Sequence, residues 1–256
     1  MDVTNRFVLD FAVRYARQHG GARVLDFGCG AGRMVQAGLA AGLAMAGADV
    51  YYGGSKTRAE AEQSGLLGSA IREIRDGRLE FADETFDLVV NNQVMEHVED
   101  LDAVLAEIHR VLKPGGTVLS IFPSRDVFRE GHIGIPFAHM MGRGSRLRLM
   151  YAWGLRSLGL GNWKEEAPTC RQWAVDKLAW IDTYAHYRSR REILARFQRY
   201  FSSELREIDY IRYRLLDRPG RQALAWLAGL PGVAPVARAV FRKLAFLVIV
   251  SKKAAG

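Results

Sequence analysis

The segment RVLDFGCGAGR at residues 23–33 restricts the fold of this chain more than any other stretch. Residues 24–27 read as a short buried strand, after which glycines occupy alternate positions, Gly28, Gly30 and Gly32. Glycine allows positive φ angles and lets a ligand approach the backbone closely. Because a helix follows, the segment predicts a strand, a glycine turn and a helix N-terminus, which together form a site for a polar or anionic ligand.

The spacing of these glycines differs from that of a dinucleotide-binding turn. The fingerprint G-x-G-x-x-G would place a glycine at position 33, where this chain has Arg33. An acid, Asp26, precedes the first glycine by two residues. The pattern therefore disfavours a nicotinamide-dependent reductase.

A second block of residues, 86–123, reads as strand, helix, turn and strand. FDLVVN at 86–91 is a strand, and the apolar face of residues 101–112 is helical. Lys113-Pro114-Gly115-Gly116 stops that helix, and residues 117–122 form a further strand.

The remaining elements alternate in the same way along the first half of the chain. We expect helices at 4–18, 33–46 and 56–66, and strands at 22–27, 48–52, 69–75, 205–214 and 244–250. Strands alternating with helices predict a parallel α/β sheet. Ligands bind beyond the carboxyl ends of such strands, so the loops after residues 27, 53, 75, 91 and 122 should line one crevice.

Two ordered motifs resemble those of a known family. VLDFGCGAG resembles motif I of the class I S-adenosylmethionine-dependent methyltransferases, and FDLVVNNQVMEHVED with LAEIHRVLKPGG resembles their ubiquinone-biosynthesis-like, small-molecule subgroup. The resemblance covers residues 20–123. It implies a Rossmann-like, seven-stranded, mostly parallel sheet flanked by helices. The implied domains are a cofactor-binding core at 1–123, a helical substrate-recognition insertion at 124–203 after the fifth strand, and C-terminal strands at 204–256 with an apolar helical segment between them.

The resemblance also implies S-adenosylmethionine as cofactor and S-adenosylhomocysteine as product. Asp26 would face the cofactor's ammonium through water, and Ile74 would lie near its adenine. The cofactor residues implied in this way are Asp26, Gly28, Cys29, Gly30, Gly32, Gly54, Ser55, Ile74, Asn91, Asn92 and Gln93. The family expects an acid after the second strand, and we expect none here: Gly54 and Ser55 stand at that point, and Asp49 comes too early.

The residues that would remove the acceptor's proton are predicted in the insertion. His132 is our candidate base, because it follows the fifth strand and has an ordinary pKa near neutrality, and Glu130 would orient it. His139, Tyr184 and His186 are weaker candidates. Glu96-His97 is common wording in the family, and we give it a structural role at a helix start. The histidines and Cys170 are scattered, without the spacing of metal ligands.

Charge is distributed unevenly along the chain. Residues 1–123 carry a net charge of −5, residues 124–218 carry +7, and residues 219–256 carry +6 without a single acid. This asymmetry favours an anionic partner for the second half, either an acceptor held by the arginines of 143–156 and 188–199 or a membrane surface under 219–243. A merely solvated basic face is the alternative.

The resemblance implies an O-methyltransferase acting on a small-molecule or glycan- or lipid-linked acceptor, and the charge distribution adds the hypothesis that this acceptor is anionic. Two alternatives stay open. The first is a nucleic-acid methyltransferase, although the N/D-P-P-Y-like signature of amino-methylating enzymes is absent after the fourth strand. The second is a non-catalytic scaffold of the same fold, which the missing acid would favour. Two cysteines and an N-terminus without a basic leader predict a cytoplasmic protein, with peripheral membrane contact as an option.

Overall fold

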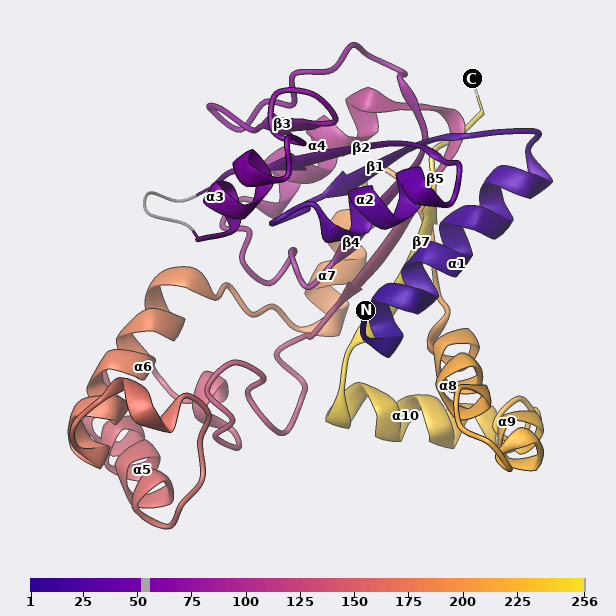
Figure 1. The fold of residues 1–256 in the computed structure, drawn as a ribbon. Helices are drawn as coiled ribbons and strands as arrows, with labels where there is room; N and C mark the ends of the chain where they lie inside the picture. Colours follow the sequence, from indigo (N-terminus) through magenta and orange to yellow (C-terminus); the bar gives the residue numbers. More distant parts are fainter. Residues whose placement is uncertain (52–55, 256) are drawn as a thin grey trace.

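The computed structural model describes residues 1–51 and 56–255, and its centre is a seven-stranded sheet in the order β3-β2-β1-β4-β5-β7-β6 (Figure 1). The strands are β1 Arg23–Phe27, β2 Ala44–Asp49, β3 Ile71–Glu73, β4 Phe86–Asn92, β5 Leu112–Phe122, β6 Ser202–Leu205 and β7 Leu247–Lys252. The first five strands pair in parallel, and β7 pairs antiparallel with both β5 and β6. The predicted fold class is confirmed.

Helices cover both faces of the sheet because successive strand residues point to opposite sides. Leu25 contributes to the core under α4 (Leu101–Val111) and α7 (Arg190–Phe197). Its neighbour Val24 contributes to the core under α1 (Val3–Gln18) and α2 (Arg33–Ala40). The further helices are α3 Lys56–Gln63, α8 Glu207–Leu216, α9 Gln222–Leu227 and α10 Ala234–Leu244.

The second strand begins and ends earlier than its sequence predicts. The predicted helix 33–46 ends at Ala40, and the strand expected at 48–52 is β2, Ala44–Asp49. Gly42, with a φ of +80°, makes the turn between them. Alanine and glycine dominate this stretch and favour helix by propensity, but small side chains suit a strand held between β1 and β3.

The strand predicted at 205–214 is wrong. A short β6 ends at Leu205, and residues 207–216 form α8. Tyr210 decides the outcome: it is fully buried, its ring meets the Phe7 ring of α1 edge to face at 5.2 Å, and its hydroxyl hydrogen-bonds to Thr4 at 2.7 Å. Packing against α1 therefore fixes a helix where the local pattern was ambiguous.

The insertion after β5 forms a helical lobe with a core of its own, at the lower left of Figure 1. It contains α5 (Arg146–Ser157), α6 (Cys170–Tyr184) and the short 3₁₀ turns η1 (Ala138–Met140) and η2 (Lys164–Glu166). Trp173 is the largest of its fully buried side chains. The next helix, α7, packs with the sheet, so the separate lobe core draws on residues 133–185.

No helix within residues 1–51 and 56–255 is both long enough and apolar enough to cross a lipid bilayer.

Candidate functional site

The glycine turn after β1 lies at the carboxyl edge of the sheet, as predicted. The backbone N–H of Gly28 donates to the carbonyl oxygen of Ala48 at 2.7 Å, which ties the turn to β2. Gly28, Gly30 and Gly32 all have positive φ angles, of 77°, 52° and 78°. A Cβ on Gly28 would lie 2.3 Å from a methyl group of Val94, so this position has no room for a side chain.

Asp49 is the last residue of β2, so the second strand does end in an acid. One of its carboxylate oxygens accepts the backbone N–H of Gly30 at 2.8 Å, and the other accepts the N–H of Tyr51 at 3.2 Å. The expectation of a second strand without a terminal acid is therefore wrong, because that strand ends at Asp49 and not at residue 52. The predicted contacts of Gly54 and Ser55 fall outside the described residues.

Asp26 is buried under the glycine turn, next to this acid. Burial, and then the charge of Asp49, raise the pKa of Asp26 to about 7. Two carboxyl groups thus lie near one turn, and a cationic ligand group beside them would favour their ionised forms.

The loops at this edge enclose a cleft of about 530 Å³. Of the predicted cofactor residues, Gly28, Ile74 and Gln93 line it, together with Asp49 and His97. Its other described lining residues are Phe27, Val50, Gly77, Val94, Val98, Glu99, Asp100, Ala103, Val104, Glu107, Thr183, Tyr184 and His186. The crevice expected from parallel strand topology is therefore present after β1, β2, β3 and β4.

Other predicted cofactor residues point elsewhere. The Asn91 side chain is buried in the sheet and donates to the Ser120 hydroxyl at 2.9 Å, while Asn92 donates to Asn5 of α1. The Cys29 side chain packs in the small core beside α3, and burial raises the pKa of its thiol. None of these three side chains lines the cleft.

Gly32 has a packing role too. It is the residue before α2, and a Cβ there would lie 2.4 Å from the Ile71 side chain of β3. A larger residue would push α2 away from the sheet.

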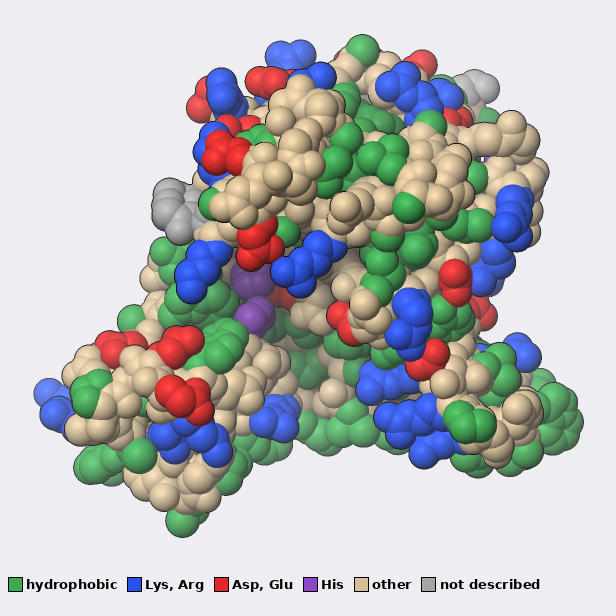
Figure 2. Space-filling view, viewed as in Figure 1, with side chains coloured by type: hydrophobic (Ala, Val, Ile, Leu, Met, Phe, Trp, Pro, Cys, Tyr) green, Lys and Arg blue, Asp and Glu red, His purple; other side chains and the backbone are tan. Residues whose placement is uncertain are grey.

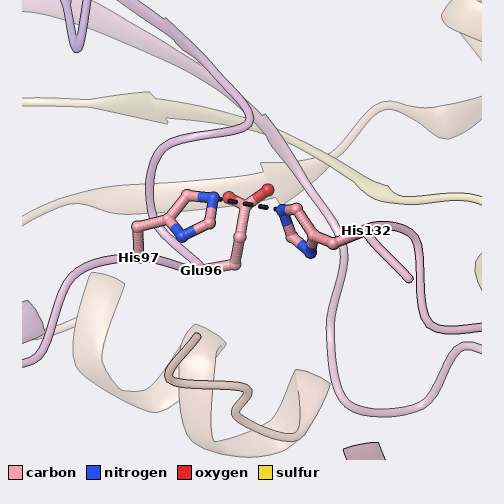
Figure 3. A group of neighbouring side chains, drawn as sticks. All are labelled: Glu96, His97 and His132. Atoms are coloured by element: carbon pink, nitrogen blue, oxygen red, sulfur yellow. Dashed lines mark hydrogen bonds between the residues drawn. The ribbon is translucent and has the colours of Figure 1, made fainter. Parts of the chain in front are cut away.

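A cluster of polar side chains lies where the insertion meets the core (Figure 3). His132 brings its Nδ1 within 2.8 Å of a Glu130 carboxylate oxygen, so the structure joins the two residues that the sequence paired. The Tyr187 hydroxyl donates to the same carboxylate at 2.5 Å. On its other side, Nε2 of His132 lies 3.2 Å from Nε2 of His97.

The environment of the cluster separates the pKa values of its histidines. Burial lowers the pKa of His132, but the hydrogen bond and charge of Glu130 outweigh burial and raise the net pKa. Burial also lowers the pKa of His97, and there it prevails.

Glu96 and His97 do not lie at a helix start, where the sequence analysis placed them. Helix α4 begins later, at Leu101, and Asp100 caps it by accepting the N–H of Ala103. Glu96 is 1% exposed, both of its carboxylate oxygens are without a hydrogen-bond partner among the described residues, and burial raises its pKa to about 8. The structural role predicted for this pair does not explain why the Glu96 carboxylate is buried without a partner among the described residues.

The weaker candidates from the sequence surround this cluster. The carbonyl oxygen of Tyr184 accepts Nδ1–H of His97 at 2.7 Å, and the N–H of His186 donates to the carbonyl oxygen of Glu96 at 2.6 Å. The His139 ring lies against the Tyr187 ring at an interplanar angle of 53°, with ring centroids 4.9 Å apart. Trp180 closes one side, 5.1 Å from the His132 ring. Figure 2 shows histidine side chains deep in the hollow between the upper core and the lower left lobe.

Several arginines that the sequence analysis proposed for binding an anionic acceptor instead make ion pairs or ring contacts within the protein. Arg148 is buried and pairs with Asp182 at 2.5 Å. Arg196 and Arg199 both pair with Asp102 of α4. Arg156 lies over the Trp173 ring, 5.7 Å from its centroid. These side chains have structural partners, a role that differs from both acceptor binding and a solvated basic face.

Comparisons with known proteins agree with this architecture. Residues 25–120 match the family model of a methyltransferase domain. The ubiquinone biosynthesis O-methyltransferase of Mesorhizobium japonicum is 36% identical over 107 residues, which cover 40% of this chain and 41% of that protein. The corresponding protein of Ruegeria pomeroyi is 41% identical over 101 residues, covering 39% and 40%. This chain thus spans about two fifths of the length of these curated relatives.

The likeness to a solved structure extends beyond the matched segment. An S-adenosylmethionine-dependent methyltransferase from Mesorhizobium loti superposes with a TM-score of 0.54 at 18% identity, over 96% of this chain and 100% of that one. At this identity the likeness shows the fold alone. The glycine turn, the sheet order and the matched segment together identify residues 25–120 as a methyltransferase domain of the class I, S-adenosylmethionine-dependent type.

Proposed function

We propose that the protein binds S-adenosylmethionine in the cleft and methylates a hydroxyl oxygen of a small-molecule or glycan- or lipid-linked acceptor. The observation that carries this proposal is the position of Asp49 at the end of β2, 2.8 Å from the backbone of the glycine turn. An acid at this point removes the reason for a non-catalytic scaffold. The O-methyltransferases among its relatives support oxygen as the acceptor atom.

The residues of the cleft fit the cofactor in size and charge. A volume of about 530 Å³ lies within the ordinary range for cofactor sites. Asp49, Glu99 and Asp100 line the cleft, and their charges complement a ligand that carries a sulfonium and an ammonium group. Gly28 and Ile74 also line the cleft, where the resemblance implied cofactor contacts.

The cofactor supplies an electrophilic methyl group, and the chain must align the acceptor with it and remove the acceptor's proton. Alignment of the reactants is worth roughly 7–11 kcal/mol. His132, held by Glu130 and facing His97, is the group that we propose for the proton, where general base catalysis contributes about 10²–10⁴-fold. Trp180 and Tyr184 beside it favour an acceptor with an apolar or aromatic surface.

Calorimetric titration with S-adenosylmethionine and S-adenosylhomocysteine tests the cofactor. We expect micromolar binding of both by the wild-type protein, and well-folded protein that binds neither would restore the scaffold alternative. Transfer of a labelled methyl group to phenolic, glycan and lipid-linked alcohols then tests the acceptor class. Transfer to RNA or DNA but not to these alcohols would establish the nucleic-acid alternative instead.

We also propose that α9 and α10 touch an anionic membrane surface. Apolar side chains of these helices are exposed, among them Trp226 at 62%, Val236 at 63% and Leu244 at 67%. Arg221 and Lys243 are exposed nearby, and residues 219–256 contain no acid. An amphipathic helix with this composition lies in the plane of a membrane surface.

A further inference from the structure

Three metal-ligating side chains converge where the insertion meets the core. Glu96 and His97 follow β4, and His132 follows β5, yet their ligand atoms all lie within 4.8 Å of one another (Figure 3). Two imidazoles and one carboxylate form a ligand set for divalent first-row transition metals.

The hydrogen bonds made by Nδ1 of each imidazole determine which ring nitrogen carries the lone pair. Nδ1 of His97 donates to the carbonyl oxygen of Tyr184, which can only accept, and Nδ1 of His132 donates to the carboxylate of Glu130. In the neutral rings both Nε2 atoms therefore carry lone pairs, and these atoms face each other at 3.2 Å. Two facing lone pairs need a proton or a metal ion between them.

The distance between these nitrogens suits an ion. Metal–nitrogen bonds of about 2.0–2.1 Å place two adjacent ligand nitrogens about 3.0 Å apart in octahedral geometry and about 3.4 Å apart in tetrahedral geometry. The observed separation of 3.2 Å lies between these two values.

Glu96 is the independent observation that points to a cation. Glu96 is only 1% exposed, and neither of its carboxylate oxygens has a hydrogen-bond partner among the described residues. Burial of an unpaired carboxylate is costly unless a proton or a cation compensates it. In Figure 3 the Glu96 carboxylate lies beside the line that joins the two ring nitrogens.

Outer-shell contacts complete the arrangement expected around a metal. Glu130 is fully buried and holds His132 while it accepts the Tyr187 hydroxyl at 2.5 Å and the N–H of Ile133 at 2.5 Å. A carboxylate behind a ligating histidine fixes its ring orientation and raises its basicity.

We propose that Glu96, His97 and His132 bind one divalent first-row transition-metal ion at the wall of the cofactor cleft. Three protein ligands leave positions open for water or substrate. His97 also lines the cleft, so the acceptor reaches the ion from there. This role rests on the proposed function: the ion would bind the acceptor hydroxyl and lower the pKa of that hydroxyl.

The ion would change how the acceptor is activated. His132 would be the base only in the metal-free site. With the ion bound, its Nε2 would be a metal ligand, and the proton of the bound hydroxyl would pass to water. The acceptor oxygen forms its bond to the methyl carbon as the carbon–sulfur bond breaks and its electron pair returns to sulfur. Charge is balanced, because the sulfonium becomes a neutral thioether.

Metal binding is tested directly on the tag-free, full-length protein after treatment with a chelator. We expect one equivalent of Zn²⁺ or Co²⁺ by calorimetry, with visible Co²⁺ absorption bands that report nitrogen ligation, and at least about 100-fold weaker binding of Mg²⁺. Glu96→Gln and His132→Gln should each abolish stoichiometric binding. Glu130→Gln, which keeps all three ligands, should weaken binding by about 10–100-fold.

The control is His19→Gln, an exposed histidine at the end of α1, which should bind the metals as the wild type does. Circular dichroism and thermal melting establish that each variant folds, and the wild-type Co²⁺ spectrum decides the matter if a variant does not. Wild-type protein that binds neither Zn²⁺ nor Co²⁺ stoichiometrically would overturn the inference. Because S-adenosylhomocysteine binding is measured separately on the same samples, its loss with metal binding intact would count against the proposed function alone.

Discussion

Asp49 accepts a hydrogen bond from the backbone of Gly30, with 2.8 Å between the carboxylate oxygen and the amide nitrogen. The contact joins the end of β2 to the glycine turn after β1, two segments that are neighbours only in the sheet. It places a carboxylate at the cleft wall, where ligand hydroxyl groups can reach it.

Asp49→Asn should weaken S-adenosylhomocysteine binding by about 10–100-fold, because a hydrogen bond to a charged group contributes roughly 1.5–3 kcal/mol. Calorimetry measures the change. Glu60→Gln, on the exposed face of α3 where Glu60 pairs with Arg33, is the control and should bind normally. Equal affinities for Asp49→Asn and the wild type would remove Asp49 from the cofactor site.

Gly28→Ala should be more destabilising than Gly42→Ala, although both glycines have nearly the same φ, +77° and +80°. An added Cβ at Gly28 would lie 2.3 Å from Val94, whereas at Gly42 no atom of the described residues would lie within 4 Å. The left-handed conformation alone costs about 1–2 kcal/mol for alanine, and only Gly28→Ala adds a steric cost. Urea unfolding gives both values, and similar losses would show that Val94 moves away without penalty.

Asp26 makes stability depend on pH in an unusual direction. Its pKa is raised to about 7 in the folded protein, above the ordinary value of 3.8, so the folded state holds the proton after the unfolded state has lost it. Stability therefore falls as pH rises from about 4 to 7. Asp26→Asn removes this effect, and its stability advantage over the wild type should grow by about 2–3 kcal/mol between pH 5 and pH 8.

The measurement for Asp26 is urea unfolding of both proteins across this pH range. Taking the difference between variant and wild type cancels the titration of other groups. An advantage that is constant with pH would mean that Asp26 is ionised throughout.

Trp173→Ala should loosen the insertion without unfolding the sheet. Trp173 is fully buried in the lobe core, and its indole N–H donates to the carbonyl oxygen of Asn162 at 3.0 Å. Removing a buried tryptophan costs about 3–5 kcal/mol. Hydrogen exchange should rise in α5 and α6 but not in the sheet, and Trp226→Ala, at an exposed site, should leave exchange there unchanged. Faster exchange across the whole sheet would show that lobe and core unfold as one unit.

The membrane proposal predicts that the protein sediments with vesicles containing anionic lipid and less with neutral ones, since each basic side chain near an anionic surface contributes about 1 kcal/mol. Trp226→Ser should weaken this binding about tenfold, because it removes a large apolar contact. Leu158→Ser is the control, because Leu158 is also an exposed apolar residue, at 77% against 62% for Trp226, but lies on the insertion. Equal loss in both variants would indicate general adhesion.

The sequence by itself determined the fold class, the glycine turn and the resemblance to the class I methyltransferases. β1 and β4 are strongly apolar, and Gly28 and Gly30 need positive φ angles, so local chemistry alone specifies this part of the fold. It did not determine where β2 lies, because residues 37–48 are mostly alanine and glycine and carry no clear period. The strand was therefore predicted too late in the chain, at 48–52, and Asp49 was not identified as its terminal acid.

Only the tertiary structure decided which distant side chains meet. His97 and His132 are 35 positions apart in the chain, so no spacing rule could associate them, and the chain must pass through α4 and β5 before they come within 3.2 Å. Likewise, residues 207–216 became a helix because Tyr210 packs on Phe7, more than two hundred positions away in the sequence. Local pattern fixes elements that are stable in any context, whereas these contacts exist only after the sheet has formed.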